Sequence, residues 1–442
     1  MDANETATEV IGDLLRSAWI VESARGRVFS EWIEQDERFD LASSRARQRA
    51  EIIASVLSSQ GVEPDHDLVE PHSSWIRSLL HGGPRDTQFS DLFLVRLGDW
   101  VEAHASPFLG ERKSDLQLIA EQERADVTLP SSLPEVPPFE PVEVPEVEAP
   151  GETLFRVGIL SDLHIGSERA EETARAAIAE LNASGAELVI QLGDITDHGN
   201  RSEFEIASKL LGQLQMPFAT MLGNHDVYSR EENRLSGSEY YTPSFGREPE
   251  GVILEHKGFR FAVLDSAEYG ASPFAPFSLI TGSFVEGSGG AIVRGAFSPA
   301  QHDVLAEIAA SGSDPSFIFL HHPPQPFTSF PPVLFGLRDA DSGRLHATCE
   351  SGNVWGVFAG HTHRNARSRT YGSVPVTEVA TARDFPFGYG LVDVSRYGYA
   401  YTFRQLSDRD LLEAAYPSAG LFLRRYARGS GEALAFTWER PQ

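Results

Sequence analysis

Short apolar runs alternate with helix-like segments along the chain from residue 154 onward. Apolar runs of about four to eight residues are typical of buried strands, whereas apolar positions recurring every three or four residues indicate helices. This pattern predicts helices at 168–184, 202–214 and 298–310, and strands at 154–161, 187–192, 217–222, 252–255, 259–264, 317–320, 354–358, 374–381, 390–394 and 399–405. Such alternation predicts an α/β domain built in layers, with some antiparallel strands linked by hairpins.

Residues 1–128 carry helical periodicity and few strand signals. Apolar side chains recur at helical spacing around Leu15 and Ile20, from Ile52 to Leu57, and again over 92–105. We therefore expect a smaller, mostly helical N-terminal domain. Its role is not evident from the sequence, although a regulatory or oligomerising module is one hypothesis.

Between these regions, residues 129–152 are rich in proline, glutamate and valine. Repeated proline removes amide donors and favours an extended chain, so the segment is predicted to be a semi-rigid acidic linker. The alternative is a strap lying along the second domain, and the sequence leaves both open. The predicted domains are thus 1–128, a linker at 129–152, and 153–442.

The composition narrows the classes of partner. The chain has 442 residues, with 37 basic and 64 acidic side chains and a formal charge of -27. This charge argues against nonspecific binding to nucleic acid or to an anionic membrane. The single cysteine, Cys349, precludes an intrachain disulfide and is expected to be structural. Neither a secretory leader nor an apolar stretch of the ~20 residues that span a bilayer is evident, so a cytoplasmic protein is expected.

Polar clusters follow five of the predicted strands, and together they contain carboxylate, amide and imidazole groups. Ligand sites in open α/β sheets collect at the carboxyl ends of strands, where the loops converge. Oxygen and nitrogen donors of this kind suit divalent metals such as Mn, Fe or Zn. The clusters are Asp162-Leu163-His164, Gly193-Asp194-Ile195-Thr196-Asp197, Gly223-Asn224-His225-Asp226, His321-His322-Pro323 and Gly360-His361-Thr362-His363.

The order of these clusters resembles the pattern of the calcineurin-like metallophosphoesterases, which runs DxH, GDxxD, GNH(D/E), H and GHxH. The resemblance covers roughly residues 154–406 and fills every motif position. Within that superfamily, HHPP at 321–324 followed by GHTH at 360–363 looks most like the class III cyclic-nucleotide phosphodiesterases. The resemblance implies a layered α/β/β/α metallophosphoesterase sandwich and a dinuclear, metal-dependent phosphohydrolase.

Seven metal ligands are implied by this resemblance, for two divalent ions whose identity among Mn, Fe and Zn stays open. Asp194 would belong to both ions. Asp162, His164 and His363 would be the other ligands of the first ion. Asn224, His321 and His361 would be the other ligands of the second ion. His321 is preferred over His322 because it stands two positions before Pro323, although Pro324 would favour His322.

The resemblance also implies a mechanism, in which a metal-bridging hydroxide attacks phosphorus. His225 would protonate the leaving oxygen or stabilise the transition state, and Asp197 could orient its imidazole. His322, Arg338 and Arg364 are candidates for contacts with the substrate.

A phosphodiesterase acting on small phosphoesters such as cyclic nucleotides is the function that the resemblance favours. The alternatives within the superfamily are a phosphomonoesterase, a pyrophosphatase and a nuclease. A binding scaffold that keeps the fold without catalysis is the alternative from another class, and the complete ligand set argues against it.

Overall fold

The computed structural model describes two compact units of the chain, one before residue 127 and one from residue 139 onward. In the first, the described residues are 15, 19, 20, 22–31, 38–59, 61, 66, 69, 73 and 112–126. In the second they are 139–229, 231, 232, 234–249, 251–267, 295–310, 312, 314–324, 336, 337, 339–371, 373–416 and 427–441. The helix predicted over 92–105 lies outside the described residues.

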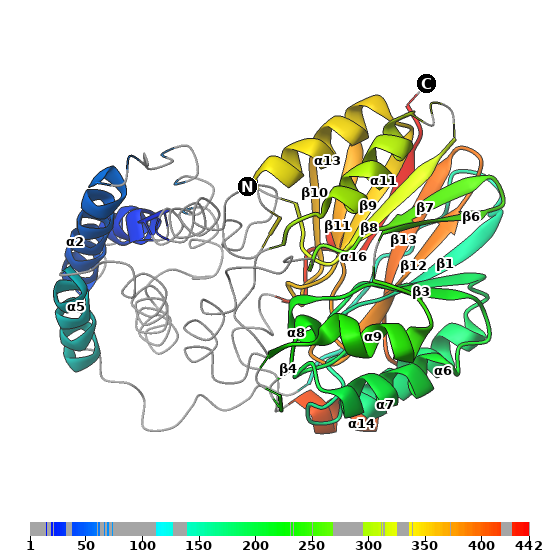
Figure 1. Ribbon diagram of the computed structural model, residues 1–442, viewed down its shortest axis with the longest axis horizontal. Coiled ribbons are helices and arrows are strands. Elements are labelled where there is room, and N and C mark those ends of the chain that lie inside the picture. Colours follow the sequence, from blue (N-terminus) through cyan, green and yellow to red (C-terminus); the bar gives the residue numbers. More distant parts are fainter. Residues whose placement is uncertain are drawn as a thin grey trace. The chain divides into compact units, whose positions relative to one another are not determined.

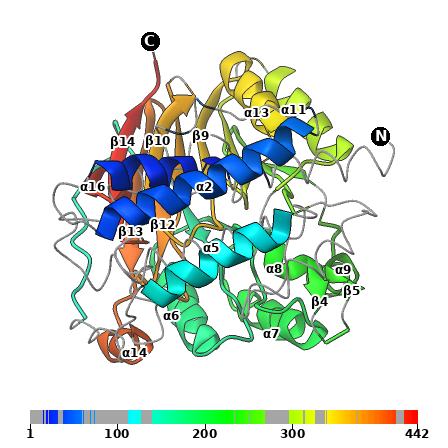
Figure 2. The same cartoon turned by 90° about the vertical axis from the view of Figure 1, so that its left-hand side faces the viewer.

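Helices make up the described part of the N-terminal unit, as predicted. α2 spans Arg38–Ser59 and α5 spans Lys113–Asp126, and the two helices pack against each other (Figure 2). Ile53 and Leu57, one turn apart on α2, are fully buried. The helical spacing of apolar residues in this segment therefore creates a buried face.

The second unit contains two six-stranded sheets with mixed strand directions (Figure 1). In the first sheet the order is β14-β13-β12-β1-β2-β3, with β1, β2 and β3 parallel and the remaining pairs antiparallel. Its strands are β1 (Phe155–Leu160), β2 (Leu188–Gln191), β3 (Phe218–Thr220), β12 (Gly388–Val394), β13 (Gly398–Gln405) and β14 (Ala435–Glu439).

The second sheet has the order β10-β11-β9-β8-β7-β6. Its four central strands are parallel, and β6 and β10 add antiparallel edges. The strands are β6 (Val252–His256), β7 (Phe259–Val263), β8 (Ser316–Leu320), β9 (Val354–Ala359), β10 (Ala366–Tyr371) and β11 (Val374–Glu378).

Helices cover the outer faces of both sheets, which gives the predicted α/β/β/α layering. α6 (Ala170–Ala183), α7 (Arg201–Leu211) and α9 (Gly237–Phe245) lie on one side, and α11 (Pro299–Ala310) and α13 (Asp339–Ser351) lie on the other (Figures 1 and 2). Shorter elements complete the unit: α8 (Asn224–Val227), the β4–β5 hairpin (Tyr228–Ser229 and Arg234–Leu235), α14 (Arg409–Ala415) and α16 (Gly431–Leu434).

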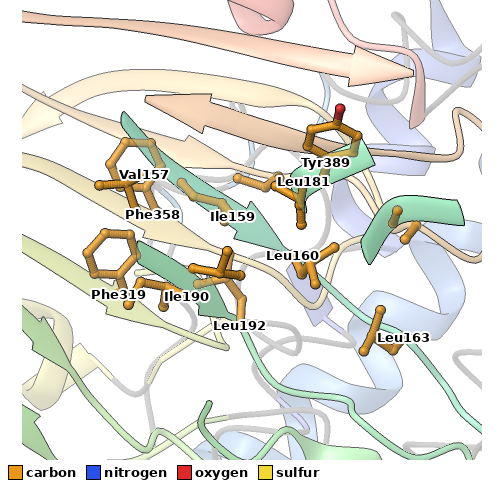
Figure 3. Packing of buried hydrophobic residues seen from close by; sticks show 14 of the residues in the cluster. Val157, Ile159, Leu160, Leu163, Leu181, Ile190, Leu192, Phe319, Phe358 and Tyr389 are labelled. Carbon is orange, nitrogen blue, oxygen red and sulfur yellow. The ribbon is translucent and has the colours of Figure 1, made fainter. Parts of the chain in front are cut away.

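The core between the sheets is largely aromatic and aliphatic (Figure 3). Phe319 of β8 stacks on Phe358 of β9 with ring centroids 5.4 Å apart. β1 is buried on both faces apart from Arg156, which explains its apolar run from Val157 to Leu160. On its helix side Gly158 lets Leu181 of α6 approach closely, since a Cβ there would lie 2.5 Å from a Leu181 methyl.

Residues 139–150 lie along the first sheet, which is the strap alternative for this part of the proline-rich segment. The amide of Val142 donates to Oε1 of Gln405 at 2.9 Å, and Val142 is buried in the main core. The hydroxyl of Thr437 donates to the carbonyl of Glu148 at 2.8 Å, and that of Ser395 to the carbonyl of Pro150 at 2.7 Å. The domain limits at 128 and 152 stay a prediction.

Among the described helices, none is long and apolar enough to cross a membrane. Cys349 lies in α13, and its side chain packs in the core beneath that helix.

Candidate metal centre

All five polar clusters follow the carboxyl ends of parallel strands. β1 leads into Asp162, β2 into Asp194, β3 into Asn224, β8 into His321 and β9 into His361. Because these strands are parallel to one another within each sheet, the loops at their carboxyl ends meet at one edge of the sandwich. The backbone turns sharply there, with left-handed φ angles at Asp162 (50°), His164 (47°), Asp194 (47°), His361 (70°) and His363 (53°). Such conformations in residues other than glycine concentrate at functional sites.

One group of four side chains brings its ligand atoms within 4.8 Å of one another: Asp162, His164, Asp194 and His363. Nε2 of His363 lies 3.5 Å from Oδ1 of Asp162, and Nε2 of His164 lies 3.6 Å from Oδ2 of Asp194. These are the residues that the resemblance assigns to the first metal.

A second group surrounds His321. Its Nε2 lies 3.1 Å from Oδ1 of Asn224 and 3.4 Å from Oδ2 of Asp194. The ligand atoms of His321, His322 and His361 also lie within 4.8 Å of one another. Asp194 therefore faces residues of both groups, which is the position expected of a shared ligand.

Three of the imidazoles are fixed through their second nitrogen. Nδ1 of His164 donates to Asp197 (3.0 Å), that of His363 to Asp384 (3.1 Å), and that of His321 to the carbonyl of Leu192 (2.7 Å). A protonated Nδ1 leaves Nε2 as the atom that faces the cluster and can bind a metal. The oxygen and nitrogen donors and these fixed tautomers fit divalent metal ions.

The electrostatics of the cluster depend on close contacts between carboxylates and imidazoles. Burial alone would raise the pKa of Asp194, but the charge and hydrogen bond of His321 hold it well below the usual range. Burial would lower the pKa of His321 and His363, but their carboxylate neighbours raise these values to about 9 and about 10. At His361 burial and the charge of His321 prevail and lower the pKa to about 3.

His225 lies beside the first group, with its ring against that of His164. Its amide donates to Oδ1 of Asp194 at 2.8 Å, and Nδ1 donates to the backbone carbonyl of Asp197 at 3.0 Å. The carboxylate of Asp197 instead binds His164, so the predicted orientation of His225 by Asp197 is made through the main chain. Burial lowers the pKa of His225 to about 4, so at neutral pH the ring is neutral and Nε2 is an acceptor.

The candidates for substrate contacts have different surroundings. Nδ1 of His322 pairs with the hydroxyl of Ser266 at 3.0 Å, and its fully buried ring lies against that of His361. The buried guanidinium of Arg364 makes a two-pronged ion pair with Glu378, at 2.7 and 2.8 Å. Arg338 lies outside the described residues. Substrate contacts by all three stay predictions.

Four groups around the cluster were assigned no role from the sequence. Asp226 follows His225 directly and accepts hydrogen bonds from the amides of Ile195, Thr196 and Gly223, which tie the loops after β2 and β3 together. Its place in the GNHD motif could have signalled it. Asp384, Arg383 and the pair of His198 with Glu203 lie outside the motif residues, and no local pattern marks them.

Comparison with known proteins places this site in a family. Residues 155–365 match the sequence model of the calcineurin-like phosphoesterases. A probable cyclic nucleotide phosphodiesterase of Rhodococcus erythropolis is 26% identical over 232 residues, which are 49% of this chain and 67% of that protein. The glycerophosphodiester phosphodiesterase GpdQ of Enterobacter lignolyticus is 25% identical over 246 residues, or 52% and 78% of the two chains.

The chain also resembles solved structures at low sequence identity. A dimetal phosphatase from Danio rerio matches with 17% identity and a TM-score of 0.44, covering 57% of this chain and 97% of that one. The purple acid phosphatase PPD1 of yellow lupin matches with 14% identity and a TM-score of 0.39, covering 57% and 52%. The family match at 155–365 confirms the resemblance by itself: the chain carries a calcineurin-like phosphoesterase domain.

Proposed function

We propose that this calcineurin-like phosphoesterase domain is a dinuclear metal-dependent phosphodiesterase acting on small substrates such as cyclic nucleotides. The observation that carries the proposal is the placement of Asp194 between two groups of ligand atoms, since its Oδ2 lies 3.6 Å from Nε2 of His164 and 3.4 Å from Nε2 of His321. A carboxylate with two oxygens can belong to two ions at once.

The proposed ligands are Asp162, His164, Asp194 and His363 for one ion, and Asp194, Asn224, His321 and His361 for the other. When bound, a pair of divalent ions supplies a nucleophile at neutral pH and stabilises the charge that develops on a phosphoryl group. Manganese, iron and zinc all suit these donors.

The residues of the chain would divide the remaining tasks. Asp197 and Asp384 hold His164 and His363 by their Nδ1 atoms, so that both Nε2 atoms point into the cluster. His225 is placed at the side of the first group, with Nδ1 fixed by the carbonyl of Asp197. Its Nε2 can deliver a proton to a leaving oxygen only in the imidazolium form, which a bound phosphoryl anion would stabilise.

The substrate class is supported by two relatives whose names are phosphodiesterases, at 26% and 25% identity. Purified protein loaded with Mn²⁺ should hydrolyse bis(4-nitrophenyl) phosphate and 3′,5′-cyclic AMP faster than 4-nitrophenyl phosphate. Faster hydrolysis of the monoester 4-nitrophenyl phosphate would instead indicate a phosphomonoesterase. If protein that holds two metal ions per chain hydrolysed none of the three substrates, the alternative of a binding scaffold without catalysis would be favoured.

A further inference from the structure

Among the described residues, the candidate metal centre is most exposed to solvent beside its first group of ligands. The side chains of Asp162, Asp194, His164 and His321 are at most 2% exposed. Those of His225, Asp197 and His363 are 14%, 11% and 16% exposed. The most exposed described approach to the cluster thus runs past His225, Asp197 and His363.

Arg383 lies on this open side. Nη1 of its guanidinium donates to Oδ2 of Asp384 at 3.2 Å, and the same oxygen accepts Nδ1 of His363 at 3.1 Å. Asp197 lies near enough for the charge of Arg383 to act on it: burial would raise the pKa of Asp197, but the hydrogen bond and charge of His164 and the charges of His225 and Arg383 lower it to about 2. Arg383 thus stands beside both carboxylates that orient the facing imidazoles.

The main chain fixes this position. The amide of Arg383 donates to the hydroxyl of Thr381 at 2.9 Å, and that hydroxyl donates to the carbonyl of Asp162 at 2.6 Å. The loop after β11 is therefore tied directly to the loop that carries the first aspartate of the cluster. The backbone from which the Arg383 side chain extends is thus held at the edge of the cluster.

The other N–H groups of the Arg383 guanidinium are available to bind a ligand. Within the part of the chain that the structure describes, no acceptor meets Nε or Nη2 of Arg383, and the side chain is 27% exposed. Arg364 differs, because it is buried and its Nε and Nη2 both donate to Glu378. A planar guanidinium with exposed donors matches the geometry of phosphoryl oxygens, which it can bind through parallel hydrogen bonds.

We propose that Arg383 is a substrate-binding residue, which donates from Nε and Nη2 to a non-bridging oxygen of the phosphoester at the open side of the cluster. The inference rests on the proposed function, since it concerns the substrate of the same site. Nearby acidic groups would otherwise repel an anion: Asp197, Asp384 and Asp162 all lie within this region. Arg383 supplies the positive side chain that offsets them beside the entrance.

The test is the binding of inorganic phosphate to protein loaded with Mn²⁺, measured by calorimetry together with metal content. Arg383→Gln should weaken phosphate about 10-fold or more, as expected for the loss of charge-assisted hydrogen bonds, with the metal content unchanged. Arg383→Lys should recover part of the affinity, because it keeps the charge without the fork. The control is Arg175→Gln, an exposed arginine on α6 that pairs with Glu171 and should leave binding unchanged.

Two results would overturn the proposal. Equal phosphate affinity in Arg383→Gln and the unmodified protein would show that Arg383 does not bind the phosphate. Loss of metal in both Arg383 variants would mean that the residue only supports Asp384. The outcome is separate from that of the proposed function, because phosphate binding can depend on Arg383 in a protein without diesterase turnover, and diesterase turnover can persist without any such dependence.

Discussion

Nε2 of His164 and Nε2 of His363 face each other at 2.9 Å. Each ring also directs Nδ1 at a carboxylate, that of Asp197 or Asp384, so each Nδ1 carries a proton. If both rings were neutral, their two Nε2 lone pairs would face each other and repel, so one Nε2 must be protonated. His363 is that group, because hydrogen bonds to Asp162 and Asp384 outweigh burial and raise its pKa to about 10. In the metal-free protein a proton thus occupies a place that suits a cation.

Metal binding should release protons. His321 and His363 have pKa values raised to about 9 and about 10, so both are charged at neutral pH and both must lose a proton to bind a metal. Since protons compete below these pKa values, apparent metal affinity should fall in acid and rise with pH until the pH reaches about 9 to about 10.

The measurement is a Mn²⁺ titration by calorimetry in two buffers of different ionisation enthalpy. About two protons should leave per chain when both ions bind. His346→Gln, in an exposed part of α13, serves as the control and should release the same number. Release of less than one proton per chain would contradict the assignment of these two histidines.

Asp194 should be required for the binding of both metal ions, whereas each neighbouring ligand should be required for only one of them. Asp194→Ala removes an oxygen that faces both His164 and His321, so the protein should retain less than one ion per chain. His363→Ala should lose one ion and keep the other. Metal content after dialysis, measured by mass spectrometry, distinguishes these results, with Asp303→Asn on α11 as a control. Equal loss in the Asp194 and His363 variants would argue against a shared ligand.

His225 should affect turnover more than metal binding. Its amide, not its imidazole, contacts Asp194, so His225→Asn should keep both ions. If the imidazole is the general acid, kcat should fall roughly 10²–10⁴-fold with a small change in KM. Steady-state kinetics with bis(4-nitrophenyl) phosphate provide the measurement. A kcat within threefold (about 0.6 kcal/mol) of the unmodified protein would leave His225 a structural role only.

Asp384 should set the affinity of the first metal. Asp384→Asn weakens the hydrogen bond that fixes Nδ1 of His363, and changes to such partners typically cost about 10–100-fold in metal affinity. The expected result is a weaker first ion with the second unchanged, seen as two separated phases in a Mn²⁺ titration. Asp393→Asn, a carboxylate paired with Arg156 on the first sheet, is the matched control for removal of a charge.

The sequence predicts the sandwich well where strands are apolar on both faces. β1, β8 and β9 are fully or nearly fully buried, and their mostly apolar sequences identify them, although β1 contains Arg156. α13 was missed because its sequence is polar, contains Gly343, and buries few apolar side chains, among them Leu345. β10 was missed because an edge strand with alternating arginines has no apolar run.

For the candidate site, the motifs predict which residues converge but not how they are held. Asp384 and Arg383 reach the cluster because β11 pairs with β9 in parallel, which brings the loop after β11 beside the loop after β9. That pairing spans residues far apart in the chain, so no local spacing signals it. Likewise, the sequence places Asp197 near His225 without determining whether its carboxylate or its carbonyl makes the contact.

Gly158 is required by the packing of α6 on β1, and its replacement should destabilise the fold. A Cβ at this position would meet Leu181 Cδ2 at 2.5 Å and Val189 Cγ2 at 3.2 Å, within a fully buried region. Leu181 is itself enclosed, so the clash can be relieved only by shifting α6 away from the sheet. Overpacking of this kind typically costs about 1–3 kcal/mol, and Gly158→Ala should lower the free energy of unfolding by that amount.

The matched control is Gly343→Ala. This glycine lies within α13, and a Cβ there would meet no atom within 4 Å. Alanine is favoured over glycine in a helix by about 1 kcal/mol, so this variant should be as stable as the unmodified protein or more stable. Urea unfolding of the three proteins gives the comparison. Equal stability of the two variants would mean that α6 can move outward freely, which would contradict the close packing of Leu181 on β1.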